Sequence, residues 1–204
     1  KKKKKKKKKK KDGHGGSQCA EYLSKKTPEI LAKHIESSDR MDQAINQALK
    51  ELDELSLNEC ADGSGSTGVI VIIDKKSNDL WCANVGDSRC VLIKHNQQVT
   101  QLSIEHKPTD PQERKRIENA NGWVAFGRVM GILAVSRSFG DKDFKNHLKN
   151  LVVSTPSITH HLLQSNDEFI VCACDGLFDV FRNEDVPKFI RIAQEDFPEL
   201  SLDS

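Results

Sequence analysis

The hydrophobic pattern of the chain begins with a helical period. From Asp39 to Leu55, apolar residues recur every three or four positions. They are Met41, Ile45, Ala48, Leu49, Leu52 and Leu55. This spacing predicts a helix with one apolar face. Upstream, the turn Gly13–Ser17 leads into another helical stretch, which we expect Pro28 to interrupt or restart.

The period changes to that of strands after the glycine-containing segment 63–68. Val69–Ile73 is an unbroken β-branched run, which predicts a buried strand. Further strands are expected at Leu80–Val85, Cys90–Ile93, Val99–Leu102, Trp123–Val124, Leu151–Val153 and Phe169–Cys174. Helices are expected at Pro111–Asn121, stopped by Gly122, and from about Asn183, with Val186, Phe189, Ile190 and Ala193 on one face. Neighbouring strands framed by helices indicate an α+β layered fold rather than regular βαβ alternation.

Length and composition fit one globular domain with a sizeable core. The chain has 204 residues, of which 36% are hydrophobic and 30% charged. No window has the roughly 18 consecutive apolar residues of a membrane span, and no apolar signal segment follows the first residues. We therefore expect a soluble monomer of the cytoplasm or nucleus that does not act at a membrane.

Eleven lysines, Lys1–Lys11, conceal an acidic domain. The formal charge is +2, but without these lysines 21 basic residues face 30 acidic ones, which gives −9. An acidic domain is a poor match for nucleic acid, so we expect no such partner. The tract is a solvated basic arm, an expression addition or a filler for unidentified residues; the last two are favoured, because a like-charge run cannot pack into a core. We treat residues 12–204 as one domain.

The six cysteines are expected to be free thiols. They form no paired C-x-x-C elements and have no histidine spacing typical of zinc sites. Several lie in apolar runs, among them Cys82, Cys172 and Cys174, where cysteine behaves as a small buried hydrophobe. This usage fits a reducing compartment.

Two other patterns have simple interpretations. Gly63-x-Gly65-x-x-Gly68 fits the dinucleotide-binding glycine pattern, but that mechanism needs a strand before the glycines and a helix after them. The expected order here is the reverse, which favours a flexible turn. His160 and His161 are adjacent in what we interpret as a polar connection, and we expect both to be exposed.

Three aspartates precede or follow a glycine where a strand is expected to end: Asp12, Asp87 and Asp175. A carboxylate in that position is held by a rigid scaffold yet stays open to solvent, as in sites for hard cations. Aspartate and glycine are also the commonest turn residues, so each aspartate alone is weak evidence. His14 could supply a proton near neutral pH, although a lone surface histidine usually does nothing.

Together these residues resemble the type 2C family of metal-dependent serine/threonine protein phosphatases. Five segments carry the resemblance in the family's order. They are Asp12–Gly16, Gly65–Thr67, Asn84–Arg89, Gly131–Asp141 and Cys174–Asp179. With the turn Glu105–Pro108 between them, they cover nearly everything from Asp12 to about Ile190, and five in order are highly specific.

The resemblance implies an α+β fold in which two antiparallel β-sheets pack as a sandwich flanked by α-helices, with Mn²⁺ or Mg²⁺ bound at one end. Asp12 would bridge two metals, the Gly13 carbonyl would bind one and Asp175 the other. Asp87 would share a weaker third ion with Asp175. The implied reaction is hydrolysis of phosphoserine and phosphothreonine in proteins by a metal-activated hydroxide, with His14 protonating the departing oxygen.

Other parts of the family's pattern are absent. The family has an apolar strand before its Asp-Gly-His-Gly-Gly motif, where this sequence has lysines, which cannot form a buried strand. An upstream phosphate-binding arginine, an upstream Glu-Asp pair and a late Asp-Asn strand also have no counterpart. A protein truly without these residues is predicted to bind metal weakly and to have little activity. Residues 123–130 resemble the family's flap, which helps to choose the substrate.

Two classes of function stay open for such a fold. One is an active phosphatase with phosphoprotein substrates. The other is a catalytically inactive protein that binds a phosphoprotein or a kinase as a regulatory module. The missing ligands favour the second class, whereas the presence of Asp12, His14, Asp87 and Asp175 favours the first.

Overall fold

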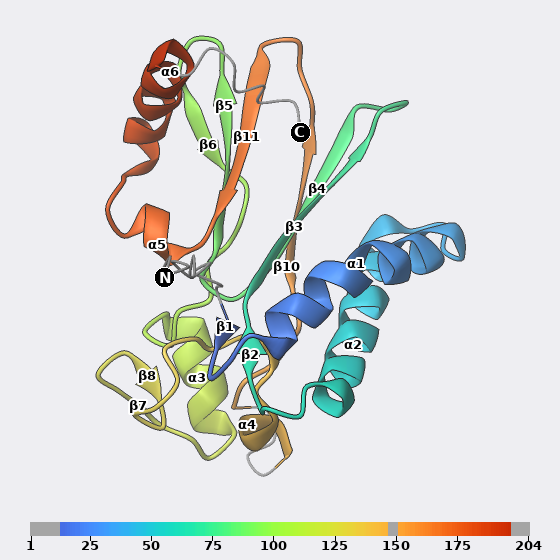
Figure 1. The fold of residues 1–204 in the computed structure, drawn as a ribbon, viewed down its shortest axis with the longest axis vertical. Coiled ribbons are helices and arrows are strands. Elements are labelled where there is room, and N and C mark those ends of the chain that lie inside the picture. The colour runs from blue at the N-terminus through green and yellow to red at the C-terminus, as the bar shows by residue number, and fades with distance from the viewer. Residues whose placement is uncertain (1–12, 147–150, 197–204) are drawn as a thin grey trace, which may run out of the picture.

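Two antiparallel sheets form the centre of the protein. The computed structural model describes residues 13–146 and 151–196 (Figure 1). The first sheet, in the order β10-β4-β3, consists of β3 (Gly68–Asp74), β4 (Asp79–Val85) and β10 (Ser157–Leu162). The second sheet, in the order β11-β5-β6, consists of β5 (Arg89–Lys94), β6 (Val99–Gln101) and β11 (Asp167–Ala173).

Helices cover the outer faces of both sheets (Figure 1). Beside the first sheet lie α1 (Gln18–Glu36) and α2 (Met41–Glu59). Beside the second lie α5 (Asp175–Phe178), the 3-10 turn η1 (Asn183–Asp185) and α6 (Val186–Asp196). Of the helices in the described ranges, none is both long and apolar enough to cross a membrane.

Smaller elements gather at one end of the sandwich (Figure 1). A three-stranded sheet joins β1 (Gly13–His14), β2 (Gly65–Ser66) and β9 (Phe139–Gly140) in the order β1-β2-β9. A hairpin joins β7 (Val124–Ala125) and β8 (Arg128–Val129). Two helices complete this end, α3 (Pro111–Asn119) and α4 (Lys142–Asn146).

The buried apolar side chains form layers that match this order. Cys90 and Leu92 of β5 pack with Leu80 and Cys82 of β4, between the two sheets. Val91 and Ile93, the alternate residues of β5, pack instead with Phe178 and Val186, under α5 and α6. A third cluster joins α1 and α2 to β4, with Ile45, Leu49, Leu52, Ala83 and Val85. Because β5 is buried on both faces, the predicted α-β-β-α sandwich is confirmed.

The predicted helices form, but two details were wrong. The helix predicted from Asp39 is α2. Pro28 does not interrupt α1, since it and Ser24 lie on the exposed side of that helix, where water can bind the carbonyl that proline leaves without a donor. In α6, Phe189 is half exposed rather than part of the buried face, and its ring packs on Phe181 at a centroid distance of 5.3 Å.

The strand predictions also needed correction in three places. Leu151–Val153 is not a strand and makes only an isolated bridge from Val153 to Arg137. The segment interpreted as a polar connection is β10, in which His160 is exposed but His161 is partly buried against Asp167. Val69–Ile73 is a strand whose side chains are only partly buried, and β3 is an edge strand of its sheet.

The cysteines are free within the described residues, as predicted. Cys82 and Cys90 are buried hydrophobic-core residues. Cys172 departs from the predicted burial, because its side chain is exposed on the edge strand β11, and Cys174 is intermediate.

Candidate active site

A cleft of about 570 Å³ opens at the end of the sandwich where the smaller elements gather. Its walls come from segments far apart in the sequence: β1, the turn between β4 and β5, the segment after β8, and the end of β11. The polar lining residues include His14, Thr67, Asp87, Asp141 and Asp175. Three of the four predicted site side chains therefore line one cleft, and the fourth, Asp12, lies outside the described residues.

Sheet register explains why Asp87 and Asp175 meet. Strands β5 and β11 are antiparallel, with Arg89 opposite Ala173. Asp87 lies two residues before β5 begins at Arg89, and Asp175 lies two residues after β11 ends at Ala173, so both lie at the same end of the sheet. Burial, and then the negative charge of Asp175, raise the pKa of Asp87. The cleft therefore contains two carboxylates whose mutual repulsion a cation would relieve.

His14 is held by the carboxylate of Asp141, a residue that the sequence pattern alone does not single out. Its Nε2 lies 2.8 and 2.7 Å from the two carboxylate oxygens of Asp141, so Nε2 carries the proton and donates it. Ser138 donates a further hydrogen bond to Asp141. Asp141 is only 6% exposed. Asp141 is the last residue of the motif segment Gly131–Asp141. Its position directly after Phe139 and Gly140 was the only sequence feature that could have marked it as a site residue.

Gly65 is the reason that Asp141 can approach His14. A Cβ at Gly65 would lie 2.2 Å from a carboxylate oxygen of Asp141, well inside contact distance. Gly65 belongs to β2, where it pairs with His14 on one side and Gly140 on the other. The interpretation of this glycine segment as a flexible turn was therefore wrong, although the predicted order of helix before and strand after is confirmed by α2 and β3.

The donor set partly fits a divalent metal. Asp87 and Asp175 supply carboxylate oxygens, the ligands that Mg²⁺ and Mn²⁺ prefer, and the pKa of Asp87 is raised first by burial and then by the charge of Asp175. Within residues 13–146 and 151–196, however, no three His, Cys, Asp or Glu side chains form a group able to hold a metal ion. A complete site needs ligands beyond these side chains.

The arginines of two quoted motifs have structural roles. Arg89 donates to Glu105 and places its guanidinium 4.7 Å from the Phe178 ring centroid, so it joins the β5 start to α5. Arg137 donates to buried Glu113 at 2.6 and 3.1 Å. Arg89 thus connects β5 to the segment of Glu105 and to α5, and Arg137 connects its own segment to α3.

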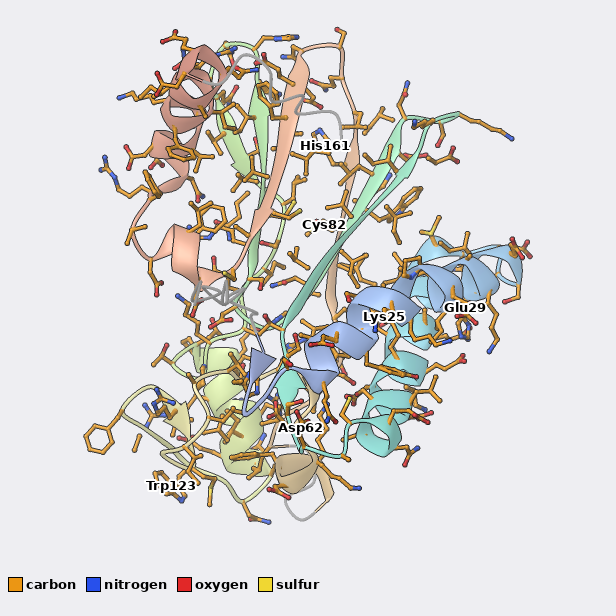
Figure 2. The ribbon with its side chains drawn as sticks, viewed as in Figure 1. Lys25, Glu29, Asp62, Cys82, Trp123 and His161 are labelled. Carbon is orange, nitrogen blue, oxygen red and sulfur yellow. The ribbon has the colours of Figure 1, made fainter. Side chains whose placement is uncertain are left out.

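The predicted flap is the β7–β8 hairpin. Phe126 at its tip is 99% exposed and has a positive φ of 53°. Trp123 at its base is also exposed and lies at the edge of the molecule (Figure 2). Arg128 and Ile132 line the cleft, and Arg128 donates to the Ile132 carbonyl at 2.7 Å. The hairpin thus places the exposed Phe126 ring near a cleft that is lined in part by the positively charged side chain of Arg128.

Comparison with known proteins identifies the family. A family model described as Protein phosphatase 2C matches residues 1–200. The chain belongs to the protein phosphatase 2C family. The resemblance seen in the five sequence segments is thereby confirmed.

Similar members of the protein phosphatase 2C family come from distant organisms. "Probable protein phosphatase 2C 52" of Oryza sativa subsp. japonica is 42% identical over 193 residues, which cover 90% of this chain and 37% of that protein. "Probable protein phosphatase 2C T23F11.1" of Caenorhabditis elegans is 40% identical over 192 residues, 88% of this chain and 52% of that protein. The chain spans about half the length, or less, of these relatives.

Solved structures confirm the fold. A structure described as "Structure of a C.elegans sex determining protein" matches with a TM-score of 0.78 and 31% identity, and the match covers 89% of this chain and 46% of that one. A phosphatase from a pathogenic strain of Toxoplasma gondii matches with a TM-score of 0.77 and 25% identity, over 94% of this chain and 74% of that one.

Proposed function

We propose that this chain contributes the catalytic cleft of a metal-dependent phosphatase that hydrolyses phosphoserine and phosphothreonine in proteins. The observation that carries the proposal is the convergence of Asp87, Asp175 and His14 on one cleft in a member of the protein phosphatase 2C family. Phosphoproteins are the proposed substrates, and the cytoplasm or nucleus is the proposed location.

Asp87 and Asp175 are the proposed metal ligands among the described side chains, together with the Gly13 carbonyl and with Asp12. The proposed ions are Mn²⁺ or Mg²⁺. When bound, such ions offset the negative charge of the carboxylates and lower the pKa of bound water. Without that charge reversal, two carboxylates would repel a phosphate dianion.

His14 is the proposed proton donor to the departing serine or threonine oxygen. Its Nε2–H is engaged with Asp141, which leaves Nδ1 as the ring atom that can present a proton to the substrate. Asp141, held by Ser138, fixes the ring orientation. An alkoxide is a poor leaving group, so a positioned acid contributes roughly 10²–10⁴-fold to the rate.

Activity assays on the full-length protein test the proposal. We expect hydrolysis of an aryl phosphate and of a phosphothreonine peptide to require Mn²⁺ and to be lost in Asp175→Asn. The control is Asp196→Asn, an exposed aspartate at the end of α6 and outside the five motif segments, which should keep the activity. Turnover that survives chelation would contradict the mechanism. Absence of metal-dependent turnover in the intact protein would favour the inactive binding module.

A further inference from the structure

Two thiols face each other across the second main sheet. Cys90 and Cys172 are Cα partners in the antiparallel pairing of β5 with β11, and their sulfur atoms are 3.5 Å apart. Directly opposite residues in such a pair have Cα atoms about 4.5–5.5 Å apart, which lies within the roughly 4.4–6.8 Å that a disulfide spans. A bond between them therefore needs rotation of side chains and no movement of strands.

The two thiols differ in access and in acidity. Among the described residues, Cys172 is exposed on β11, whereas Cys90 has no exposed surface. Hydrogen bonding from Cys90 lowers the pKa of the Cys172 thiol, while hydrogen bonds to Cys172 and Cys82 raise the pKa of Cys90. An accessible sulfur that ionises readily beside a protonated partner is the arrangement of an oxidation-sensitive pair.

We propose that Cys90 and Cys172 form a dithiol that hydrogen peroxide converts into an intrachain disulfide. The thiolate of Cys172 attacks one peroxide oxygen, the O–O bond breaks, and the released hydroxide takes a proton from solvent. The resulting sulfenic acid on Cys172 is attacked by the Cys90 sulfur, so that the S–S bond forms and the S–O bond breaks. The departing hydroxyl leaves as water with the proton of Cys90. Two thiols are oxidised and one peroxide is reduced to two waters.

The proposed disulfide would lie close to the cleft, but its formation does not depend on the proposed phosphatase activity. Cys90 follows Asp87 by three residues, and Cys172 precedes Asp175 by three. The bond would join the two strands whose ends carry these carboxylates. A third thiol, Cys82, belongs to the same buried cluster as Cys90 and lies in the region between the main sheets (Figure 2). Cys82 is the competing partner that a test must distinguish.

Peptide mapping tests the pairing. The full-length protein is treated with hydrogen peroxide, the remaining thiols are alkylated, and the digest is analysed by mass spectrometry. We expect one disulfide that joins the Cys90 and Cys172 peptides and disappears after reduction with dithiothreitol. Cys172→Ser, at an exposed position, should abolish this linkage, whereas the control Cys174→Ser, two residues further along, should keep it. A disulfide between Cys82 and Cys90 in the wild type would overturn the proposal, as would the absence of any disulfide.

Trapping of the sulfenic acid tests the order of the steps. With dimedone present during oxidation, Cys90→Ala should accumulate the adduct on Cys172, because the thiol that resolves the sulfenic acid is missing. The wild-type protein should give little of this adduct. Equal labelling of Cys172 in both proteins would contradict a resolving role for Cys90. Circular dichroism establishes that each variant is folded before oxidation.

Discussion

At the scale of single residues, the site depends on a contact between segments that are 127 positions apart. Asp141 reaches His14 only because β9 and β1 both pair with β2 and because Gly65 has no side chain to block the approach. The function of Asp141 in this account is to position the imidazole.

Replacing Asp141 with asparagine should lower kcat for a phosphothreonine peptide about ten- to a hundredfold, as part of the roughly 10²–10⁴-fold contribution of a positioned acid. The loss should be smaller for nitrophenyl phosphate, since its leaving group needs less protonation. Asp143→Asn, an exposed aspartate on α4, is the matched control and should keep wild-type kcat. Steady-state kinetics on both substrates measure the difference. Equal losses on the two substrates would exclude this role.

Sequence alone predicted the residues whose positions follow from local pattern. Asp87 and Asp175 adjoin glycines at the ends of clear hydrophobic runs, which singled them out, whereas their closeness was implied only by the family resemblance and follows from the pairing of β5 with β11. Asp141 was not identified, because its importance arises from the pairing of three two-residue strands that no periodicity reveals. The close approach of Asp141 to Gly65 could not be predicted from the sequence for the same reason.

At the scale of elements, the β7–β8 hairpin combines an ordered base with an exposed apolar tip. Arg128 closes the turn through the Ile132 carbonyl, and both residues line the cleft. Phe126 projects into solvent with 99% exposure. Burial of the Phe126 ring against a protein substrate would favour binding, because the free energy gained grows with the apolar area removed from water.

Phe126→Ala should therefore weaken recognition of protein substrates while sparing small ones. We expect kcat/KM for a phosphopeptide to fall several-fold, by a rise in KM, with nitrophenyl phosphate hydrolysis unchanged. The control is Leu162→Ala, an exposed apolar residue at the end of β10. If Phe126→Ala changes both substrates alike, the hairpin acts on the cleft itself rather than on peptide binding.

Long, strongly periodic elements were predictable, and short ones were not. The helix α2 and the strands β4, β5 and β11 follow their hydrophobic patterns. The polar composition of residues 157–162, with His160 and His161, predicts a connection rather than a strand. The segment nevertheless forms β10, because it pairs with β4 along its whole length. Leu151 and Val152 are buried in one cluster with Ile117 and Val129, and the run Leu151–Val153 makes only one isolated bridge, from Val153 to Arg137.

At the scale of the whole molecule, two buried carboxylates, Asp53 and Glu113, are held in ion pairs near the cleft. Lys145 of α4 lies 2.6 Å from the carboxylate of Asp53 on α2, and Asp53 also accepts from the Gly140 amide at 3.0 Å. Glu113 of α3 is 4% exposed and is paired with Arg137 and Arg116. The pairs Lys145–Asp53 and Arg137–Glu113 join segments that are distant in sequence, whereas Arg116–Glu113 lies within α3.

Lys145→Met should destabilise the protein by roughly 3–5 kcal/mol, because Asp53 would remain buried without its cation. Lys50→Met removes an exposed lysine whose amine is 3.9 Å from Glu54, and it should change stability by less than about 1 kcal/mol. Urea unfolding followed by circular dichroism compares the two. A loss for Lys145→Met no larger than the control's would show that water reaches Asp53 in solution.

Acid should remove the contribution that Glu113 makes to the free energy of unfolding. Burial alone would raise the pKa of Glu113, but hydrogen bonds from Arg137 and Arg116 outweigh it and lower the pKa from 4.5 to about 2. Because the folded pKa lies below the unfolded value, about 3 kcal/mol of stability is present above pH 4.5 and is lost as the pH falls toward 2.

Unfolding free energies measured from pH 6 to pH 2 should therefore decline less steeply in Glu113→Gln than in the wild-type protein. Glu118→Gln, an exposed position on the same helix, should follow the wild-type curve. Parallel curves for wild type and Glu113→Gln would place the acid sensitivity in other groups.

The most direct test of the account is the position of a divalent cation in crystals of the full-length protein grown with Mn²⁺. Anomalous scattering locates manganese directly and independently of any activity assay. The account predicts a strong peak in contact with the carboxylate of Asp175, lost in Asp175→Asn crystals. Saturating Mn²⁺ with no peak at the Asp87 and Asp175 end of the sheet, or with peaks only elsewhere, would contradict it.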